Sequence, residues 1–175
     1  LFRSQRCQCD GLRTLYLNAR SCKAYVASDD SRTRRICEIT ILQELVYSGD
    51  FDVVGICETW LNESVIDSEI ITGYSIFRRD REDLGGGVIV AVKGNTQASR
   101  RFHLERENTE LVVVELKRCH EKSVQLYCFY HPNTSPDPIL KLNCSLCDNC
   151  ESACIIVLGI SIYLNSTGLA IKLLQ

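Results

Sequence analysis

Residues 52–60 read DVVGICETW and hold the strongest fold signal in the chain. The run 52–57, DVVGIC, is almost entirely apolar and has the length of a strand, which is typical of a strand buried on both faces. The run ends at Glu58, so a carboxylate stands at the carboxyl end of a buried strand. In open α/β sheets this end of the strands carries the functional groups. The stretch therefore predicts an α/β protein and singles out Glu58.

Before this stretch, the sequence predicts one strand and one helix. The strand covers 12–17 and ends at Asn18, a second polar residue at a strand end. Residues 34–47 carry apolar side chains at helical spacing, and Ser48-Gly49 ends the pattern. We therefore expect an amphipathic helix between two strands that both finish in a polar residue.

Beyond residue 60 the pattern changes to short segments rich in β-branched and aromatic residues, which favour strands. The loop 131–138 holds all three prolines, and a helix can begin there because proline is tolerated in a first turn. The architecture predicted from these patterns is α/β with a mixed or antiparallel sheet. The expected strands are 74–77, 88–92, 111–116, 124–130 and 155–158.

The composition narrows the class of protein. The chain has 175 residues, and 20 Lys and Arg against 22 Asp and Glu give a net charge of -2. This charge offers no general attraction to nucleic acid, so any DNA contact must be local.

No stretch approaches the roughly 20 apolar residues of a membrane span, and no signal peptide opens the chain. We expect an intracellular protein without a membrane partner, and the lack of methionine indicates a fragment.

Eleven cysteines form an odd set without a secretion signal, which favours reduced thiols. Four of them follow the spacing C-x2-C-x2-C-x3-C, which is that of an iron–sulfur or zinc ligand run. The run lacks the usual following proline and a second run, and the same periods arise on one helical face. A metal module at Cys144, Cys147, Cys150 and Cys154 is the weaker alternative, and we expect Cys22, Cys37, Cys57, Cys119 and Cys128 to act as small buried hydrophobes.

Other polar features carry less information. The glycines at 85–87 precede a strand rather than a helix, which predicts a tight hairpin and not a phosphate loop. The three histidines share no ligand spacing.

Asn18 and Glu58 together suit a hard cation that keeps several waters, as Mg²⁺ does. From the residues alone, the alternative of two capped strand ends is slightly favoured over a metal site.

Four strings in this order then resemble a known family. They are LYLNARS at 15–21, DVVGICETWLNESVIDSEI at 52–70, GYSIFRRDRED at 73–83 and GGGVIVAVK at 85–93. The chain resembles, over about residues 13–159, the endonuclease domain of non-LTR (LINE-type) retrotransposons, within the endonuclease/exonuclease/phosphatase superfamily.

This resemblance implies a four-layered α/β sandwich of the deoxyribonuclease-I type, with two mixed β-sheets flanked by helices and an incomplete C-terminal part. The domain would span 12–159, followed by a divergent tail at 160–175. It implies Mg²⁺-dependent hydrolysis of DNA phosphodiester bonds, DNA at the target site as partner, and a reverse transcriptase domain in the same polyprotein. Members of the family act in the nucleus.

Carried over residue by residue, the resemblance places metal and phosphate binding on Asn18 and Glu58, and Tyr130 near the scissile phosphate. His131 stands where the family usually has arginine. The family's GDFN motif falls on Gly159-Ile160-Ser161-Ile162, so its Asp and Asn are both isoleucine, and the closing Ser-Asp-His motif is missing.

The resemblance also implies a mechanism in which Glu58 holds the ion, an Asp prepares the water, and Asn and His stabilise charge on phosphorus. Loss of a general base costs about 10²–10⁴-fold. We therefore expect a degenerate domain with weak or no activity. A frameshift or wrongly predicted exon after Gly159 is the favoured cause.

A second hypothesis from a different class is a non-catalytic nucleic-acid-binding remnant. It would bind through the arginines that cluster around the third string and after residue 99, although such a set also forms solvated hairpin surfaces. These arginines are Arg78, Arg79 and Arg81, with Arg100 and Arg101.

Overall fold

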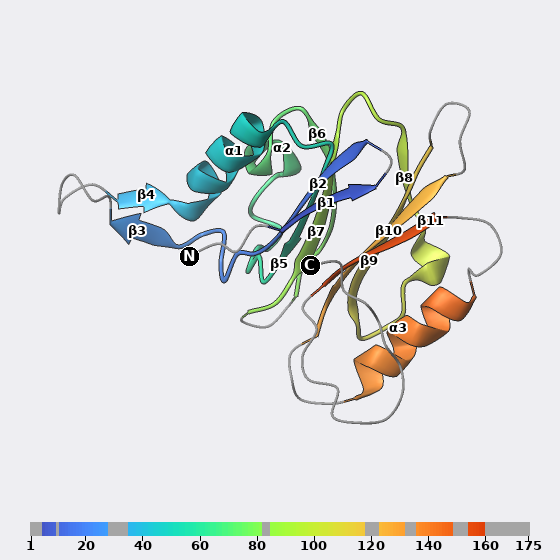
Figure 1. Cartoon of the computed structure of the whole chain (residues 1–175). Helices are drawn as coiled ribbons and strands as arrows, with labels where there is room; N and C mark the ends of the chain where they lie inside the picture. Colours follow the sequence, from blue (N-terminus) through green and yellow to red (C-terminus); the bar gives the residue numbers. More distant parts are fainter. Residues whose placement is uncertain are drawn as a thin grey trace.

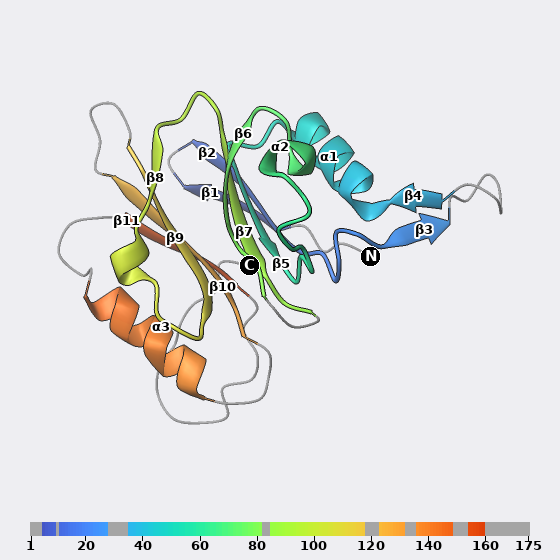
Figure 2. The ribbon, with the colours of Figure 1, turned by 180° about the vertical axis from the view of Figure 1, so that it is seen from behind.

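Two β-sheets pack face to face in the computed structural model, and helices lie on the outer side of each sheet (Figure 1). The layers run helix, sheet, sheet, helix, and the view from behind shows the same order (Figure 2). This confirms the predicted four-layered α/β sandwich. The structure describes residues 5–9, 11–27, 35–81, 85–117, 123–131, 136–148 and 154–159.

The first sheet contains the buried strand that ends directly before Glu58. Its strand order is β1-β2-β5-β7-β6, and β2 and β5 are parallel, with Asn18 opposite Cys57. The other neighbours are antiparallel, so the sheet is mixed. Every residue of β5 is buried, as its apolar sequence predicts. The strands are β1 (Gln5–Cys9), β2 (Leu12–Asn18), β5 (Val53–Cys57), β6 (Tyr74–Arg79) and β7 (Val88–Lys93).

The second sheet is built from the later part of the chain. Its strand order is β11-β10-β9-β8, with β10 and β11 parallel and the other pairs antiparallel. Each predicted strand in this region is present within one or two residues of its expected bounds. The strands are β8 (Ala98–Arg100), β9 (Glu110–Leu116), β10 (Val124–Tyr130) and β11 (Cys154–Gly159).

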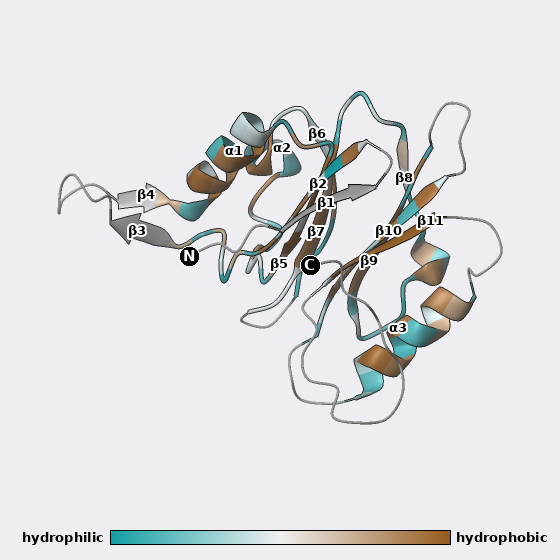
Figure 3. Ribbon diagram, in the orientation of Figure 1, coloured by the Kyte–Doolittle hydropathy of each residue, from teal (hydrophilic) through white to brown (hydrophobic). Residues whose placement is uncertain are grey.

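The core follows from the alternation of side chains along these strands. Between the sheets, alternate residues such as Val90, Val114 and Leu126 are fully buried. The outer face of the first sheet packs on the apolar side of α1 (Glu38–Gly49), and that of the second sheet on α3 (Asp137–Cys147). Figure 3 shows the central strands as the most hydrophobic part of the ribbon. The short helix α2 (Asp67–Ile70) lies beside α1.

One predicted boundary is wrong. The helix expected from about residue 34 begins at Glu38, because residues of β4 (Arg35–Cys37) pair with β3 (Tyr25–Ala27) in a small hairpin. Ile36 keeps the helical spacing of the apolar residues after it, so the periodicity could not separate it from the helix. The hairpin, β1, α2, β8 and the 3₁₀ turn at Phe102–Leu104 have no counterpart in the sequence prediction.

The structure allows the predicted domain, 12–159, and the predicted tail, 160–175, to be compared with the fold only in part. The backbone of β1 pairs with β2 over its whole length, so the first sheet starts at Gln5, before the predicted boundary at residue 12. The tail 160–175 lies outside the described residues. None of the helices in the described part has the length and apolar character that a membrane crossing requires.

The cysteines occupy two kinds of position. Cys22, Cys57 and Cys128 are buried in the core, as expected. Cys37, also expected to be buried, is only half-buried at the start of α1, and Cys119 lies outside the described residues. Cys144 and Cys147 are exposed on α3, and Cys154 is exposed on β11. Among the described residues, no three or more His, Cys, Asp or Glu side chains gather into a group that could hold a metal. Cys150 lies outside the described residues. The cysteine-metal alternative thus has no ligand cluster in this part of the chain.

Candidate functional site

Strands β2, β5 and β10 end at one rim of the sandwich. The parallel register brings the ends of β2 and β5 side by side. Strand β10 of the other sheet lies against β5 there, with 3.8 Å between the sulfurs of Cys57 and Cys128. Strand β9 begins at the same rim, because Glu110 stands opposite Tyr130. The fold therefore gathers side chains that are far apart in sequence.

Asn18 and Glu58, the two predicted strand-end residues, are in direct contact. The Asn18 side-chain amide donates a hydrogen bond of 2.6 Å to Glu58 Oε1. Asn18 Oδ1 accepts the backbone N–H of Arg20 at 3.1 Å, which fixes the orientation of the amide. The structure thus uses Asn18 to orient the Glu58 carboxylate, and direct metal binding by Asn18 stays a prediction.

The backbone at Glu58 adopts a conformation that non-glycine residues seldom take. Its φ is 54°, in the left-handed region, and Trp60 has a φ of 53°. Such residues cost about 1–3 kcal/mol and persist only where the surroundings fix them. On one side the carbonyls of Glu58 and Thr59 accept the N–H groups of Ser21 and Cys22, both at 2.8 Å. The carboxylate is therefore held on a restrained turn.

Tyr130 joins the pair from the second sheet. Burial raises the pKa of its phenol to about 12, with smaller contributions from the charge of Glu58 and a hydrogen bond to it. At neutral pH the phenol therefore keeps its proton and can donate it in a hydrogen bond. The neighbouring His131 is buried and stacks on Phe129, with 6.2 Å between ring centroids, and burial lowers its pKa.

Glu110 belongs to the same rim, although the sequence analysis did not single it out. Its Oε2 accepts the backbone N–H of Gly87 at 2.6 Å, and its Oε1 lies 3.3 Å from Nη1 of Arg81. Burial raises the pKa of Glu110, and the negative charge of Glu58 adds to the effect. The position of Glu110 in the sequence could have indicated this. Glu110 lies two residues before Val112 and four before Val114, so it belongs to the strand face that points between the sheets.

The glycines at 85–87 form a tight turn before β7, as predicted. All three have positive φ, between 72° and 90°. The carbonyl of Gly86 accepts the N–H of Trp60 at 3.0 Å, and that of Gly87 accepts the N–H of Thr59 at 3.4 Å. The turn therefore supports the residues after Glu58 on the side opposite to Ser21 and Cys22.

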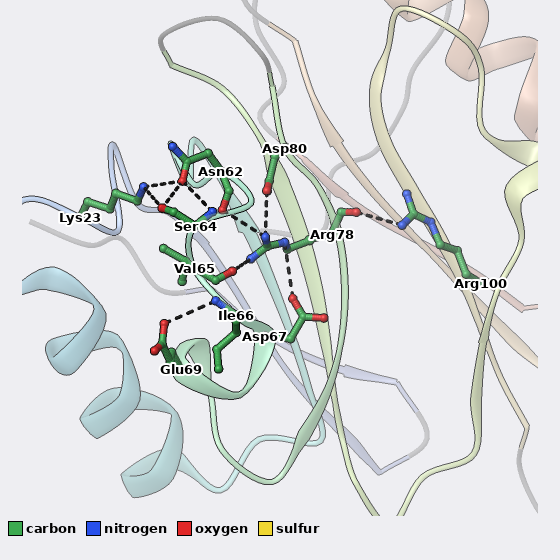
Figure 4. Close-up of polar contacts among 10 residues, drawn as sticks. All are labelled: Lys23, Asn62, Ser64, Val65, Ile66, Asp67, Glu69, Arg78, Asp80 and Arg100. Carbon is green, nitrogen blue, oxygen red and sulfur yellow. Dashed lines mark hydrogen bonds and ion pairs between the residues drawn. The ribbon is translucent and has the colours of Figure 1, made fainter.

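The guanidinium of Arg78 is engaged by other residues of the protein (Figure 4). Its guanidinium donates to the carbonyls of Val65 at 2.8 Å and Asn62 at 3.2 Å, and it lies 3.1 Å from Asp80 and 3.4 Å from Asp67. Only 15% of the side chain is exposed. The structure thus gives Arg78 a part in holding the 62–67 segment, and its nucleic-acid role stays a prediction.

The other four arginines differ in what they contact. Arg79 donates to the carbonyl of Arg106 at 3.3 Å, and Arg100 forms two bonds to Glu105 at 2.8 and 2.9 Å. Arg101 pairs with Glu115. Arg81 pairs with Glu110 of the rim while 40% of its side chain is exposed. Of the predicted arginines, Arg81 therefore combines proximity to the rim with the largest exposed side chain.

Positions 160 and 162 lie outside the described residues. Strand β11 runs parallel to β10 up to Gly159, which stands opposite Phe129. The two isoleucines thus follow a strand that ends next to Tyr130 in the neighbouring strand.

The donor set at the rim fits a hard divalent cation that keeps most of its water. Glu58 supplies carboxylate oxygen, the preferred ligand of Mg²⁺, which proteins often bind through one or two carboxylates. No cluster of three or more acidic, His or Cys side chains that could enclose an ion exists within the described residues. The residues therefore fit an open Mg²⁺ site and not a closed structural one.

Comparisons with known proteins agree with the fold. No protein-family model matches the sequence, and no curated protein matches it. The endonuclease domain of TRAS1, a telomere-specific non-LTR retrotransposon, superposes with a TM-score of 0.60 at 15% identity, over 85% of this chain and 59% of that domain. This chain thus spans less than two thirds of that domain's length.

Two structures of TDP2 from D. rerio are more distant. A humanized variant has a TM-score of 0.46 at 14% identity, over 69% of this chain and 56% of that chain. A complex with a single-strand DNA product has a TM-score of 0.44 at 12% identity, over 69% and 52%. The similarity to the TRAS1 endonuclease domain shows that the chain has the deoxyribonuclease-I-like sandwich that the resemblance implied.

Proposed function

We propose that this chain is a retrotransposon-derived endonuclease domain that binds Mg²⁺ and DNA at the rim, with weak or no hydrolysis of DNA phosphodiester bonds. The observation that carries the proposal is the 2.6 Å contact between Asn18 and Glu58 at a rim shared with Tyr130. The fold shared with the TRAS1 endonuclease domain supports it. DNA is the proposed partner, with a reverse transcriptase domain of the same polyprotein, and the nucleus is the proposed location.

Each residue of the rim has a role in this proposal. Glu58 would hold Mg²⁺, which when bound polarises a phosphate oxygen and offsets its charge. Asn18 keeps the carboxylate oriented. Tyr130, protonated at neutral pH, would donate a hydrogen bond to the phosphate. Arg81 would attract the phosphate backbone as the substrate approaches.

Hydrolysis should be slow because the chain lacks groups that the resemblance assigns to the water and to the developing charge. Positions 160 and 162 are isoleucine, and an apolar side chain can neither accept a proton nor donate a hydrogen bond. A missing general base costs about 10²–10⁴-fold and a missing charge-stabilising donor about 10²–10³-fold. In this proposal, metal binding rests on Glu58 and DNA attraction on Arg81, which the chain retains.

Nicking of supercoiled plasmid by purified protein in Mg²⁺, with an EDTA control, tests this proposal together with calorimetric titration of Mg²⁺. We expect Mg²⁺ to bind and nicked circles to form at least about 10²-fold more slowly than with an active domain of this fold. Nicking at the rate of an active domain would contradict the degenerate assignment. Folded protein that binds no Mg²⁺ would contradict the site.

The second candidate function is nucleic-acid binding without catalysis, which the exposed Arg81 beside the rim favours. In Arg81→Ala the affinity for duplex DNA should fall, and the slope of log K against log salt should shrink by about 0.9, because each phosphate contact releases counterions. Arg13→Ala is the matched control, since Arg13 is exposed and ion-paired at the opposite end of β2. Equal slopes for wild type and Arg81→Ala would remove Arg81 from the DNA surface.

A further inference from the structure

We infer that Glu110 is a positioning residue for Glu58: its carboxylate fixes the glycine turn at 85–87, and this turn fixes the backbone that follows Glu58. The inference deepens the proposed function, because it concerns the same site. The contacts that support it lie within the chain, so the role of Glu110 in holding the turn can be tested without metal or DNA.

The first step is the contact between Glu110 and the turn. The Gly87 N–H donates to Glu110 Oε2 at 2.6 Å, and the Glu110 side chain is 15% exposed. A Cβ at Gly86 would lie 2.5 Å from Oε2 and 2.6 Å from Oε1, so the carboxylate occupies the space next to this glycine. The turn and the carboxylate therefore fit each other closely, and the positive φ of both glycines makes the approach possible.

The second step is the contact between the turn and the residues after Glu58. The Gly86 carbonyl accepts the N–H of Trp60, and the Gly87 carbonyl accepts the N–H of Thr59. A Cβ at Gly87 would lie 2.5 Å from Thr59 Oγ1, so these two segments also pack without space for a methyl group. A chain of hydrogen bonds thus runs from Glu110 through the turn to Thr59 and Trp60.

The third step is why Glu58 needs this support. Glu58 and Trp60 both have left-handed backbone conformations, which are unfavourable for residues with a Cβ. Ser21 and Cys22 hold the segment from the side of β2, and the glycine turn holds it from the side of β7. Without Glu110, the buried N–H of Gly87 loses its acceptor and Arg81 loses its partner. The turn is then free to move, and one of the two supports of Glu58 is lost.

Trp60 makes this inference directly measurable, because it is the sole tryptophan of the chain and lies two residues after Glu58. In Glu110→Ala we expect acrylamide quenching of Trp60 to rise roughly twofold and its anisotropy to fall, as local restraint is lost. Glu110→Gln keeps a carbonyl oxygen for Gly87 and should stay close to wild type. Arg81→Ala, which removes the ion pair alone, should also leave Trp60 unchanged.

Glu115→Ala is the matched control. Glu115 is a buried carboxylate of the same strand that pairs with Arg101. It should lower the free energy of unfolding in urea without changing the quenching of Trp60. If Glu110→Ala does not fold, Glu110→Asp serves instead, because its shorter side chain withdraws the carboxylate from the N–H of Gly87.

Folded Glu110→Ala protein with wild-type quenching and anisotropy would overturn the inference. As a second readout, Glu110→Ala should weaken Mg²⁺ binding about 10–100-fold, the usual effect of removing a group that orients a ligand. If the wild type shows no Glu58-dependent Mg²⁺ binding, the proposed function fails, while the fluorescence result still decides the role of Glu110.

Discussion

In Glu58→Ala the affinity for Mg²⁺ should fall by at least about 100-fold, since the variant removes the carboxylate that the rim offers to a hard cation. The hydrogen-bond donor of Asn18 also loses its acceptor at 2.6 Å. Calorimetric titration of Mg²⁺ measures the loss, and any Mg²⁺-dependent nicking of plasmid should disappear with it. DNA affinity in EDTA should stay near wild type, because Arg81 is unchanged.

Two variants make this result specific. Glu63→Ala removes an exposed carboxylate five residues further along the chain and should leave Mg²⁺ binding unchanged. Glu58→Gln keeps the size of the side chain and an acceptor for Asn18, yet it should lose Mg²⁺ binding because the charge is gone. Wild-type Mg²⁺ affinity in Glu58→Gln would show that the ion binds elsewhere.

Leu126→Ala should lower the free energy of unfolding by about 2–5 kcal/mol. Leu126 is fully buried in the middle of β10, on the face that packs against the first sheet. The substitution removes apolar contacts and leaves a cavity between two sheets that cannot close over it without shifting. Urea unfolding followed by circular dichroism measures the change.

Leu140→Ala is the matched control for this prediction. Leu140 lies on α3 with 59% of its surface exposed, so the same substitution should change the free energy of unfolding by less than about 0.5 kcal/mol. A loss below about 1 kcal/mol for Leu126→Ala would contradict the packing of the two sheets.

The location of most strands could be predicted from the sequence because their signal is local. Largely apolar runs such as 53–57 and 124–130 predict buried strands. The positions of proline and glycine predict where the chain turns. The resemblance added the arrangement of these strands in two sheets, which periodicity alone left open. The start of α1 was missed because pairing of residues 35–37 with β3 overrides their helical spacing.

The candidate site was predictable in part. Asn18 and Glu58 were found because each follows a strand, and parallel neighbours deliver such residues to one rim. Arg78 and Arg79 look equivalent in the sequence, yet alternation along β6 sends their side chains to opposite faces. Of these two, Arg79 comes near Glu110, where Arg81 also lies, while Arg78 holds the 62–67 segment.

By itself, the sequence determined most of the strands, their buried faces and the two polar strand ends, since each of these depends on neighbours within a few residues. The tertiary structure decided which distant residues meet. The hydrogen bonds that link Glu110 to Gly87, and Gly86 to Trp60, join three separate segments of the chain. Such contacts have no local pattern, because they depend on the register between strands and on the packing of one sheet against the other.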